Sequence, residues 1–165
     1  MIVEYHKFGP KPDKYIWSRT FTQFEKDLEL IKEYNHQIRM DDGHLSQALA
    51  CFLAEKKGLQ VYLGITVDYV GKYGYFTWQD IIELSRKHII CNHSVHHEHL
   101  DKKSDSEIYK ELSEANYLIK KNTGIQPKYY CPTYNFVNSD IVKNCSILEL
   151  EILDPVLAVD NKITL

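Results

Sequence analysis

Residues 88–100 of the chain are HIICNHSVHHEHL, and this stretch combines two patterns. Its first five residues, HIICN, are a short apolar run of the kind found in buried β-strands. Directly after this run, four of the chain's eight histidines fall close together: His93, His96, His97 and His99. His93 could pair with His97, four residues on, or with His96, three residues on, since either spacing places two imidazoles on one face of a helical turn. The stretch therefore predicts a buried strand that ends at a two-histidine metal site.

A second polar cluster, Asp41-Asp42-Gly43, follows another predicted strand at residues 36–40. A two-histidine site commonly adds a carboxylate ligand and leaves positions open for water and substrate. Of two adjacent carboxylates, one can bind the ion while the other accepts a proton from water. Gly43 would let the backbone turn tightly behind them. D-D-G is also a common surface turn, but its occurrence together with the histidine cluster, both at strand ends, favours a metal site.

Short apolar runs alternate with helical patterns along the chain. Strands are predicted at residues 1–5, 36–40, 59–66, 88–92 and 127–132, with one or two more within 146–153 and 156–165. Helices are predicted from Thr22, with a capping-box spacing to Glu25, and at Leu45–Lys57, 77–87, Ser104–Asn122 and Asp140–Asn144. This alternation is typical of a parallel sheet, open or closed into a barrel. In such folds ligands collect where strands end, which is where both polar clusters lie.

The apolar spacing also predicts which faces of three helices are buried. The first helix should bury Phe24, Leu28 and Ile31. The second should bury Leu45, Leu49, Phe52 and Leu53 and end at Gly58. The helix at Ser104–Asn122 should bury Ile108, Leu112, Ala115 and Ile119 and end near Gly124.

Composition sets broader limits. A chain of 165 residues with 44% hydrophobic and 26% charged residues suits a single soluble domain spanning 1–165. The formal net charge of -3, without a run of Lys or Arg, argues against a nucleic-acid partner. No apolar run is long enough to span a membrane and no secretory signal is seen, which predicts a cytoplasmic protein. The four cysteines lie in or beside apolar runs, which favours buried free thiols.

Three stretches together resemble the polysaccharide deacetylase family, carbohydrate esterase family 4. They are RMDDGHLSQ at 39–47, TWQDIIELSRKHIICNHSVHHEHL at 77–100 and TGIQPKYYCPTYN at 123–135. They occur in the family's order and roughly at its spacing, and the resemblance covers nearly the whole chain. It implies an α/β fold: a distorted, shortened (β/α) barrel with a mostly parallel sheet.

The resemblance selects between the two histidine pairs. The family's second motif, H-[ST]-x-x-H, matches His93, Ser94 and His97. The resemblance implies that Asp42, His93 and His97 bind a divalent metal, with zinc expected, that Asp41 is the catalytic base, and that Ser94 steadies the loop. Family members hydrolyse N-acetyl, or sometimes O-acetyl, groups on polymeric sugars. The implied partner is therefore an N-acetylated carbohydrate substrate.

Substrate contacts are expected from two loops. The proline–tyrosine turn of the family's third motif maps onto Pro132 and Tyr134. A backbone N–H near Tyr134 would stabilise the oxyanion of the reaction. Tyr73 and Tyr75 lie on a glycine-containing loop and are candidates for stacking against sugar rings.

Two features depart from the family's pattern. The third motif usually begins with an arginine that pairs with the catalytic aspartate, and this chain has Cys131 there. Arg39, close to Asp41 in sequence, is not expected to replace it. The family's late motifs supply a histidine as general acid, yet this chain has no histidine after His99. The candidates for the general acid are His6, His44 and His96.

These observations predict a metal-dependent hydrolase that removes N-acetyl groups from an amino sugar in a polysaccharide or glycan precursor. The missing arginine and late histidine leave an alternative: an inactive deacetylase-like domain that binds metal or glycan. A second alternative is a related metal-dependent amidase that acts on a non-sugar C–N bond.

Overall fold

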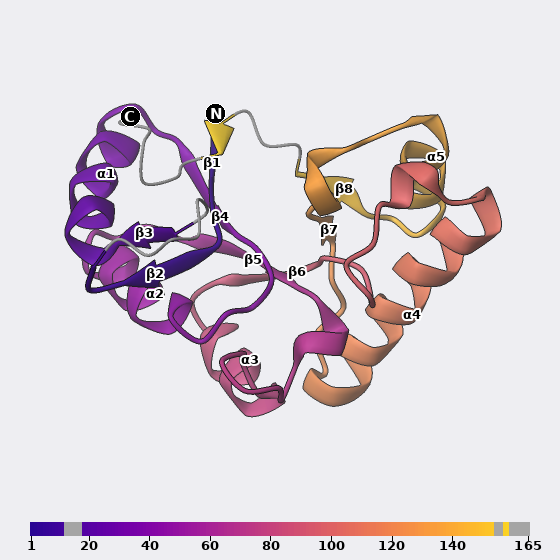
Figure 1. Cartoon of the computed structure of the whole chain (residues 1–165), viewed down its shortest axis with the longest axis horizontal. Coiled ribbons are helices and arrows are strands. Elements are labelled where there is room, and N and C mark those ends of the chain that lie inside the picture. Colours follow the sequence, from indigo (N-terminus) through magenta and orange to yellow (C-terminus); the bar gives the residue numbers. More distant parts are fainter. Residues whose placement is uncertain (12–17, 154–156, 159–165) are drawn as a thin grey trace.

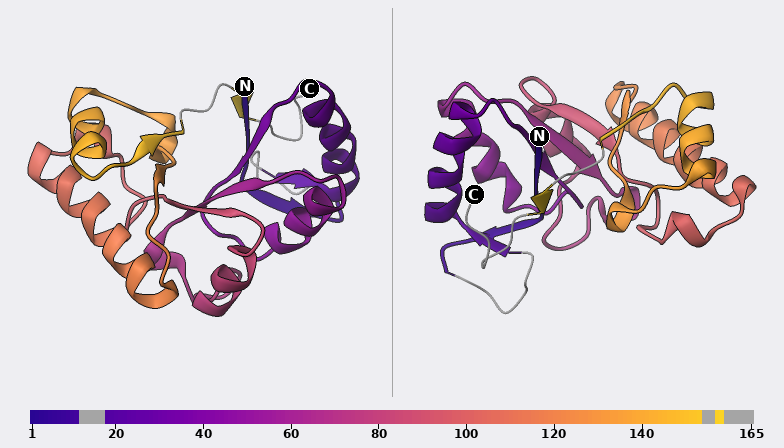
Figure 2. Two further views of the ribbon diagram at one scale, coloured as in Figure 1. Left: turned by 180° about the vertical axis from the view of Figure 1, so that it is seen from behind. Right: turned by 90° about the horizontal axis from the view of Figure 1, so that it is seen from above.

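The computed structural model describes residues 1–11, 18–153 and 157–158. Seven strands form one sheet in the order β8-β7-β6-β5-β4-β1-β9, and all its pairings are parallel. The strands are β1 (Ile2–Tyr5), β4 (Gln37–Met40), β5 (Val61–Ile65), β6 (Ile89–Asn92), β7 (Tyr129–Tyr130), β8 (Glu151–Ile152) and β9 (Leu157–Ala158). The sheet curves without closing (Figures 1 and 2), which confirms the shortened barrel.

A second, smaller sheet was not predicted. It consists of β2 (Lys7–Gly9) and β3 (Ser18–Thr20), which pair in parallel. Of the predicted strand at residues 156–165, only Leu157–Ala158 lies among the described residues, where it forms β9.

The α-helices of the described residues lie around the outside of the curved sheet (Figures 1 and 2). They are α1 (Phe21–Glu33), α2 (Gln47–Lys56), α3 (Trp78–Leu84), α4 (Asp105–Thr123) and α5 (Ser139–Ile147). Short 3-10 helices follow three strand ends: η1 (Val67–Tyr69), η2 (Leu100–Lys102) and η3 (Thr133–Asn135). The helices cover the outer face of the sheet. The loops at the carboxyl ends of the strands stay accessible, and this is where sites form in such folds.

The predicted start of α1 is wrong by two residues. Thr20 is the N-cap, and the capping box forms between Thr20 and Gln23 rather than between Thr22 and Glu25. The predicted inward residues of α1 are buried, as are all four of α4. Gly58 and Gly124 end α2 and α4 with φ angles of 73° and 77°, a backbone conformation that glycine adopts without steric cost.

The predicted buried face of α2 is largely wrong: of its four residues, only Leu53 packs against the core. Leu45, Leu49 and Phe52 are 49%, 47% and 50% exposed, whereas the helix buries Gln47, Ala50, Cys51 and Ala54. Apart from Gln47, the buried side chains of this helix are small. Gln47 is buried because its Nε2 donates to the carbonyl oxygens of His6 and Asp41. The helix therefore directs Gln47, rather than Leu49, toward the backbone of Asp41.

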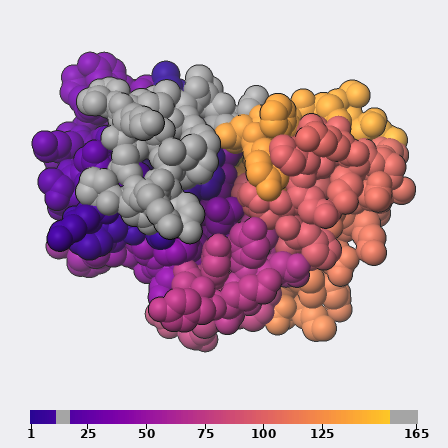
Figure 3. All heavy atoms as spheres, viewed as in Figure 1, coloured from indigo at the N-terminus to yellow at the C-terminus, as the bar shows by residue number. Residues whose placement is uncertain are grey.

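Apolar clusters pack the helices against the curved sheet. The largest joins β1, β4, β5 and β6 to helices α1 to α4, and another joins α4 and α5 to Tyr130 of β7. In Figure 3 the N-terminal part, in indigo to magenta, and the C-terminal part, in salmon to yellow, adjoin in one continuous surface. All four cysteines are buried and free, as predicted. Among the described residues, no helix has the length and apolar character needed to span a bilayer.

Candidate metal-binding active site

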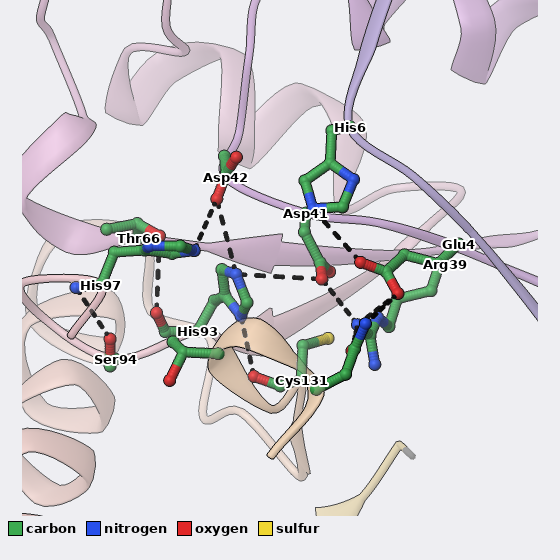
Figure 4. A network of polar contacts seen from close by, with 12 residues as sticks. Glu4, His6, Arg39, Asp41, Asp42, Thr66, His93, Ser94, His97 and Cys131 are labelled. Atoms are coloured by element: carbon green, nitrogen blue, oxygen red, sulfur yellow. Dashed lines mark hydrogen bonds and ion pairs between the residues drawn. The ribbon is translucent and has the colours of Figure 1, made fainter. Parts of the chain in front are cut away.

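Two strand ends bring the predicted metal ligands together (Figure 4). Asp42 follows β4, and His93 and His97 follow β6. Asp42 Oδ1 lies 3.1 Å from His97 Nε2 and 3.5 Å from His93 Nε2. One donor atom from each of the three residues lies within 4.8 Å of the others. We call Asp42, His93 and His97 the ligand trio, because their atoms converge closely enough to bind a single ion.

The second ring nitrogen of His93 fixes the imidazole for this task. Nδ1 lies 2.7 Å from the carbonyl oxygen of Cys131. A carbonyl only accepts, so Nδ1 carries the proton and Nε2 presents a lone pair to the ligand trio. Among the described residues, His93 Nε2 and Asp42 Oδ1 are buried atoms without a hydrogen-bond partner. Buried polar atoms are normally satisfied, so these two fit a ligand that protein atoms do not supply.

The charges of the site support a cation here. Burial raises the pKa of Asp42, but the close His93 and His97 imidazoles, 3.5 and 3.1 Å away, hold it well below its usual range. Burial lowers the pKa of His93, yet the carboxylates of Asp41 and Asp42 raise it above its ordinary value. With both imidazoles neutral, the carboxylate of Asp42 is left as an uncompensated negative charge within the ligand trio. A divalent cation would compensate this charge.

The backbone around the ligand trio is strained. Asp42, Ser94 and His97 have φ angles of 74°, 64° and 56°, in the left-handed region that non-glycine residues rarely adopt. Such conformations cost on the order of 1 kcal/mol each and cluster at functional sites. Ser94 helps to hold this conformation, because its Oγ accepts the N–H of His97 at 3.1 Å. Gly43, at φ 73°, makes the predicted tight turn after Asp42.

Asp41, the predicted base, is buried beside the ligand trio. Its Oδ2 lies 3.8 Å from His93 Nε2. Arg39 Nη2 donates to the same oxygen at 2.7 Å, so Arg39, which was not expected to replace the third-motif arginine, does pair with Asp41. Side chains two residues apart along an extended strand point to the same face of the sheet, so Arg39 and Asp41 can meet there.

Room for Asp41 comes from Gly64 of β5, the strand between β4 and β6. A Cβ atom at Gly64 would lie 2.8 Å from Asp41 Oδ1 and 3.2 Å from Cys131 Sγ. We therefore expect Gly64→Ala to lower the free energy of unfolding by about 1–3 kcal/mol, the usual cost of overpacking. Urea denaturation measures this loss. Gly9→Ala is the control, since its Cβ would come only within 3.4 Å of Lys11 O; equal effects of the two substitutions would contradict the packing argument.

The three candidates for the general acid lie in different surroundings. His6 lines the same pocket as the ligand trio, and its Nε2 lies 3.2 Å from Glu4 Oε1. His44 Nδ1 lies 2.8 Å from Ser46 Oγ. His96 is 51% exposed and pairs with Glu111, in a separate hollow. His6 is therefore the candidate that the structure brings to the pocket.

The predicted substrate-binding residues also separate. Tyr134 lines the pocket and its side chain is half-exposed. Its φ angle is 54°, in the left-handed region. Pro132 is buried at the start of its turn. Tyr73 is fully exposed and Tyr75 packs against Tyr69, with ring centroids 4.8 Å apart; neither is among the residues that line the pocket.

The pocket holds about 320 Å³, and three of its lining residues were not singled out from the sequence. They are Glu4, Asn135 and Phe136, which join His6 and Tyr134 around the ligand trio and Asp41. No motif marks Glu4, and its position in an apolar strand was the only available signal. Phe136 is half-exposed, and His99, the last histidine of the cluster after β6, stacks on Tyr134 with ring centroids 3.8 Å apart.

Comparison with known protein families gives one match, to polysaccharide deacetylase, over residues 31–153. The chain belongs to the polysaccharide deacetylase family. Membership supports a carbohydrate deacetylase activity in the broad sense. These deacetylases are generally metal-dependent, and the ligand trio lies within the matched region. Comparison with curated protein sequences found no match.

Solved structures of other deacetylases share the fold. The Streptococcus pyogenes deacetylase PplD, solved in complex with acetate, is 10% identical with a TM-score of 0.84, over 99% of this chain and 93% of that one. A Bacillus cereus polysaccharide deacetylase is 15% identical with a TM-score of 0.84, over 99% of this chain but only 65% of its own length. IcaB from Ammonifex degensii is 14% identical with a TM-score of 0.81, over 97% and 85%. At these identities the likeness concerns the fold.

Proposed function

We propose that this polysaccharide deacetylase family member is a metal-dependent hydrolase that removes N-acetyl groups from an amino sugar within a glycan. The observation that carries the proposal is the ligand trio at a pocket, with the Asp41 carboxylate 3.8 Å from His93 Nε2. The acetate bound in the S. pyogenes deacetylase structure is the product expected of such a reaction and supports the proposal.

The donor set fits a divalent metal. Two imidazoles and one carboxylate are a common catalytic zinc set, with a position left for water or substrate. The ion would polarise the acetyl carbonyl and lower the pKa of a water molecule. A second group of possible donors, Glu4, His6 and Asp41, lies next to the ligand trio. Its two carboxylates already share the guanidinium of Arg39, at 3.1 and 2.7 Å, which disfavours a second cation there.

Asp41 and His6 divide the proton transfers. Asp41 borders the ligand trio from the β4 side and accepts the proton of the attacking water. His6 lies in the same pocket, held by Glu4 at 3.2 Å, and donates a proton to the departing sugar amine. An amine leaves poorly without that proton, so an acid at this place completes the reaction.

The His6→Gln substitution tests the acid. We expect it to lower amide cleavage on an N-acetylated oligosaccharide by about 10²-fold or more, the usual contribution of a general acid. Cleavage of 4-nitrophenyl acetate should change little, because nitrophenolate leaves without protonation. Steady-state rates on both substrates, with His44→Gln as the matched control, give the comparison. A parallel loss on the two substrates would contradict an acid role for His6.

The function itself is tested by measuring acetate release from a panel of N-acetylated oligosaccharides. The protein is first stripped with a chelator and then supplied with zinc or cobalt. We expect release that depends on the added metal. Absence of release from every substrate would favour the alternative of a domain that only binds metal or glycan. Release from acetylated non-sugar amides, with none from sugars, would favour the amidase alternative.

A further inference from the structure

A single buried arginine holds two carboxylates of the pocket at once. Arg39 is fully buried in β4. Its Nη2 lies 2.7 Å from Asp41 Oδ2 and 3.1 Å from Glu4 Oε2. Its Nη1 donates to the carbonyl oxygen of Leu153 at 2.5 Å. The guanidinium therefore links β4 with β1 and with the chain just after β8, across the interior of the curved sheet (Figure 4 shows its carboxylate partners).

Asn135 closes this network from the loop after β7. Its Oδ1 accepts from Arg39 Nη2 at 2.6 Å, and its Nδ2 donates to Glu4 Oε2 at 2.7 Å. Asn135 itself is held at φ 59°, next to Tyr134 at 54°. Glu4 Oε2 thus accepts a hydrogen bond from Asn135 and forms an ion pair with Arg39. Its other oxygen, Oε1, is left to face His6 Nε2 at 3.2 Å.

We propose that Arg39 is the common positioning residue for both proton-transfer groups: it orients Asp41 directly and His6 through Glu4. The inference rests on the proposed function, in which Asp41 is the base and His6 the acid. The planar guanidinium presents several N–H donors in fixed directions, so one side chain can hold two carboxylates and a carbonyl oxygen in register. A lysine ammonium is a compact point charge and cannot reproduce that arrangement.

The Arg39→Lys substitution separates positioning from stability. We expect kcat to fall by about 10²-fold on the N-acetylated oligosaccharide, the size of effect produced by misplacing a catalytic group by about 1 Å. The base is affected, so 4-nitrophenyl acetate cleavage should fall as well, with KM little changed on either substrate. Arg19→Lys is the matched control, because Arg19 is also buried and pairs with a carboxylate, Asp27 at 2.6 Å, outside the pocket lining.

Glu4→Gln isolates the acid arm and guards against poor folding of the arginine variant. It keeps the size of the side chain and leaves the Arg39–Asp41 pair intact. We expect the rate on the oligosaccharide to fall by about tenfold or more while the rate on 4-nitrophenyl acetate stays within about twofold.

Three outcomes would overturn the inference. One is an Arg39→Lys enzyme with the same kcat as Arg19→Lys. Another is a Glu4→Gln enzyme that loses both activities equally or neither. The third is a wild-type protein that releases no acetate from either substrate, which also removes the proposed function. If the wild type is active but the variants do not show the expected losses of rate, the proposed function stands and the role of Arg39 is excluded.

Discussion

We expect the Asp41→Asn variant to release acetate from N-acetylated oligosaccharides about 10²–10⁴ times more slowly than the wild type, the range typical of losing a general base. Asparagine keeps the shape of the side chain but cannot accept the proton of the attacking water. The ligand trio is untouched, so zinc affinity measured by competition with a chromophoric chelator should change far less than the rate. Rates and affinities measured on one preparation separate the two effects.

The control for this substitution is Asp68→Asn. Asp68 is 45% exposed and lies 3.7 Å from His96 Nε2, outside the pocket lining. Its variant should retain full activity. A urea denaturation curve for each variant shows whether Asp41→Asn still folds. We expect that it does, because Arg39 keeps Glu4 as an ionised partner at 3.1 Å. Undiminished release by a folded Asp41→Asn enzyme would exclude Asp41 as the base.

Much of the site could be predicted because its ligands follow short apolar strands. Asp42 follows β4 and His93 follows β6, and the carboxyl ends of parallel strands meet at one edge of a sheet. The sequence could not show that β5 lies between those strands and that Gly64 leaves the space for Asp41. Distances across an intervening strand depend on sheet curvature, which no local pattern encodes.

The residues that support the site were harder to predict, because they violate simple burial preferences. Glu4, Arg39 and Gln47 are all buried, and each has a polar partner distant in sequence, such as Asn135 for Glu4. Apolar periodicity assigns such polar residues to the surface. The same rule misplaced the apolar face of α2, whose Leu49 and Phe52 are half-exposed. Arguments from periodicity therefore failed where a buried polar side chain replaces a hydrophobic one.

His97→Gln should weaken zinc binding by at least about 10²-fold, more than the loss typical of removing an outer-shell partner. Acetate release at limiting zinc should fall in proportion. His97 Nε2 lies 3.1 Å from Asp42 Oδ1, so its loss leaves two of the three donors of the ligand trio. Competition with a chromophoric chelator measures the affinity, and addition of excess zinc shows whether any activity returns.

His96→Gln is the matched control, since the two histidines are neighbours in sequence and had equal claims from spacing alone. His96 instead pairs through Nδ1 with Glu111 Oε1 at 2.5 Å, and its Nε2 faces Asp68. Glu111 also accepts the backbone N–H groups of Val95 and His96 at 3.1 and 3.2 Å, so the loop is held on α4 without the imidazole. We therefore expect zinc affinity within about threefold of wild type, well under the loss of a true ligand. Equal weakening by the two substitutions would mean that the choice of His97 over His96 is wrong.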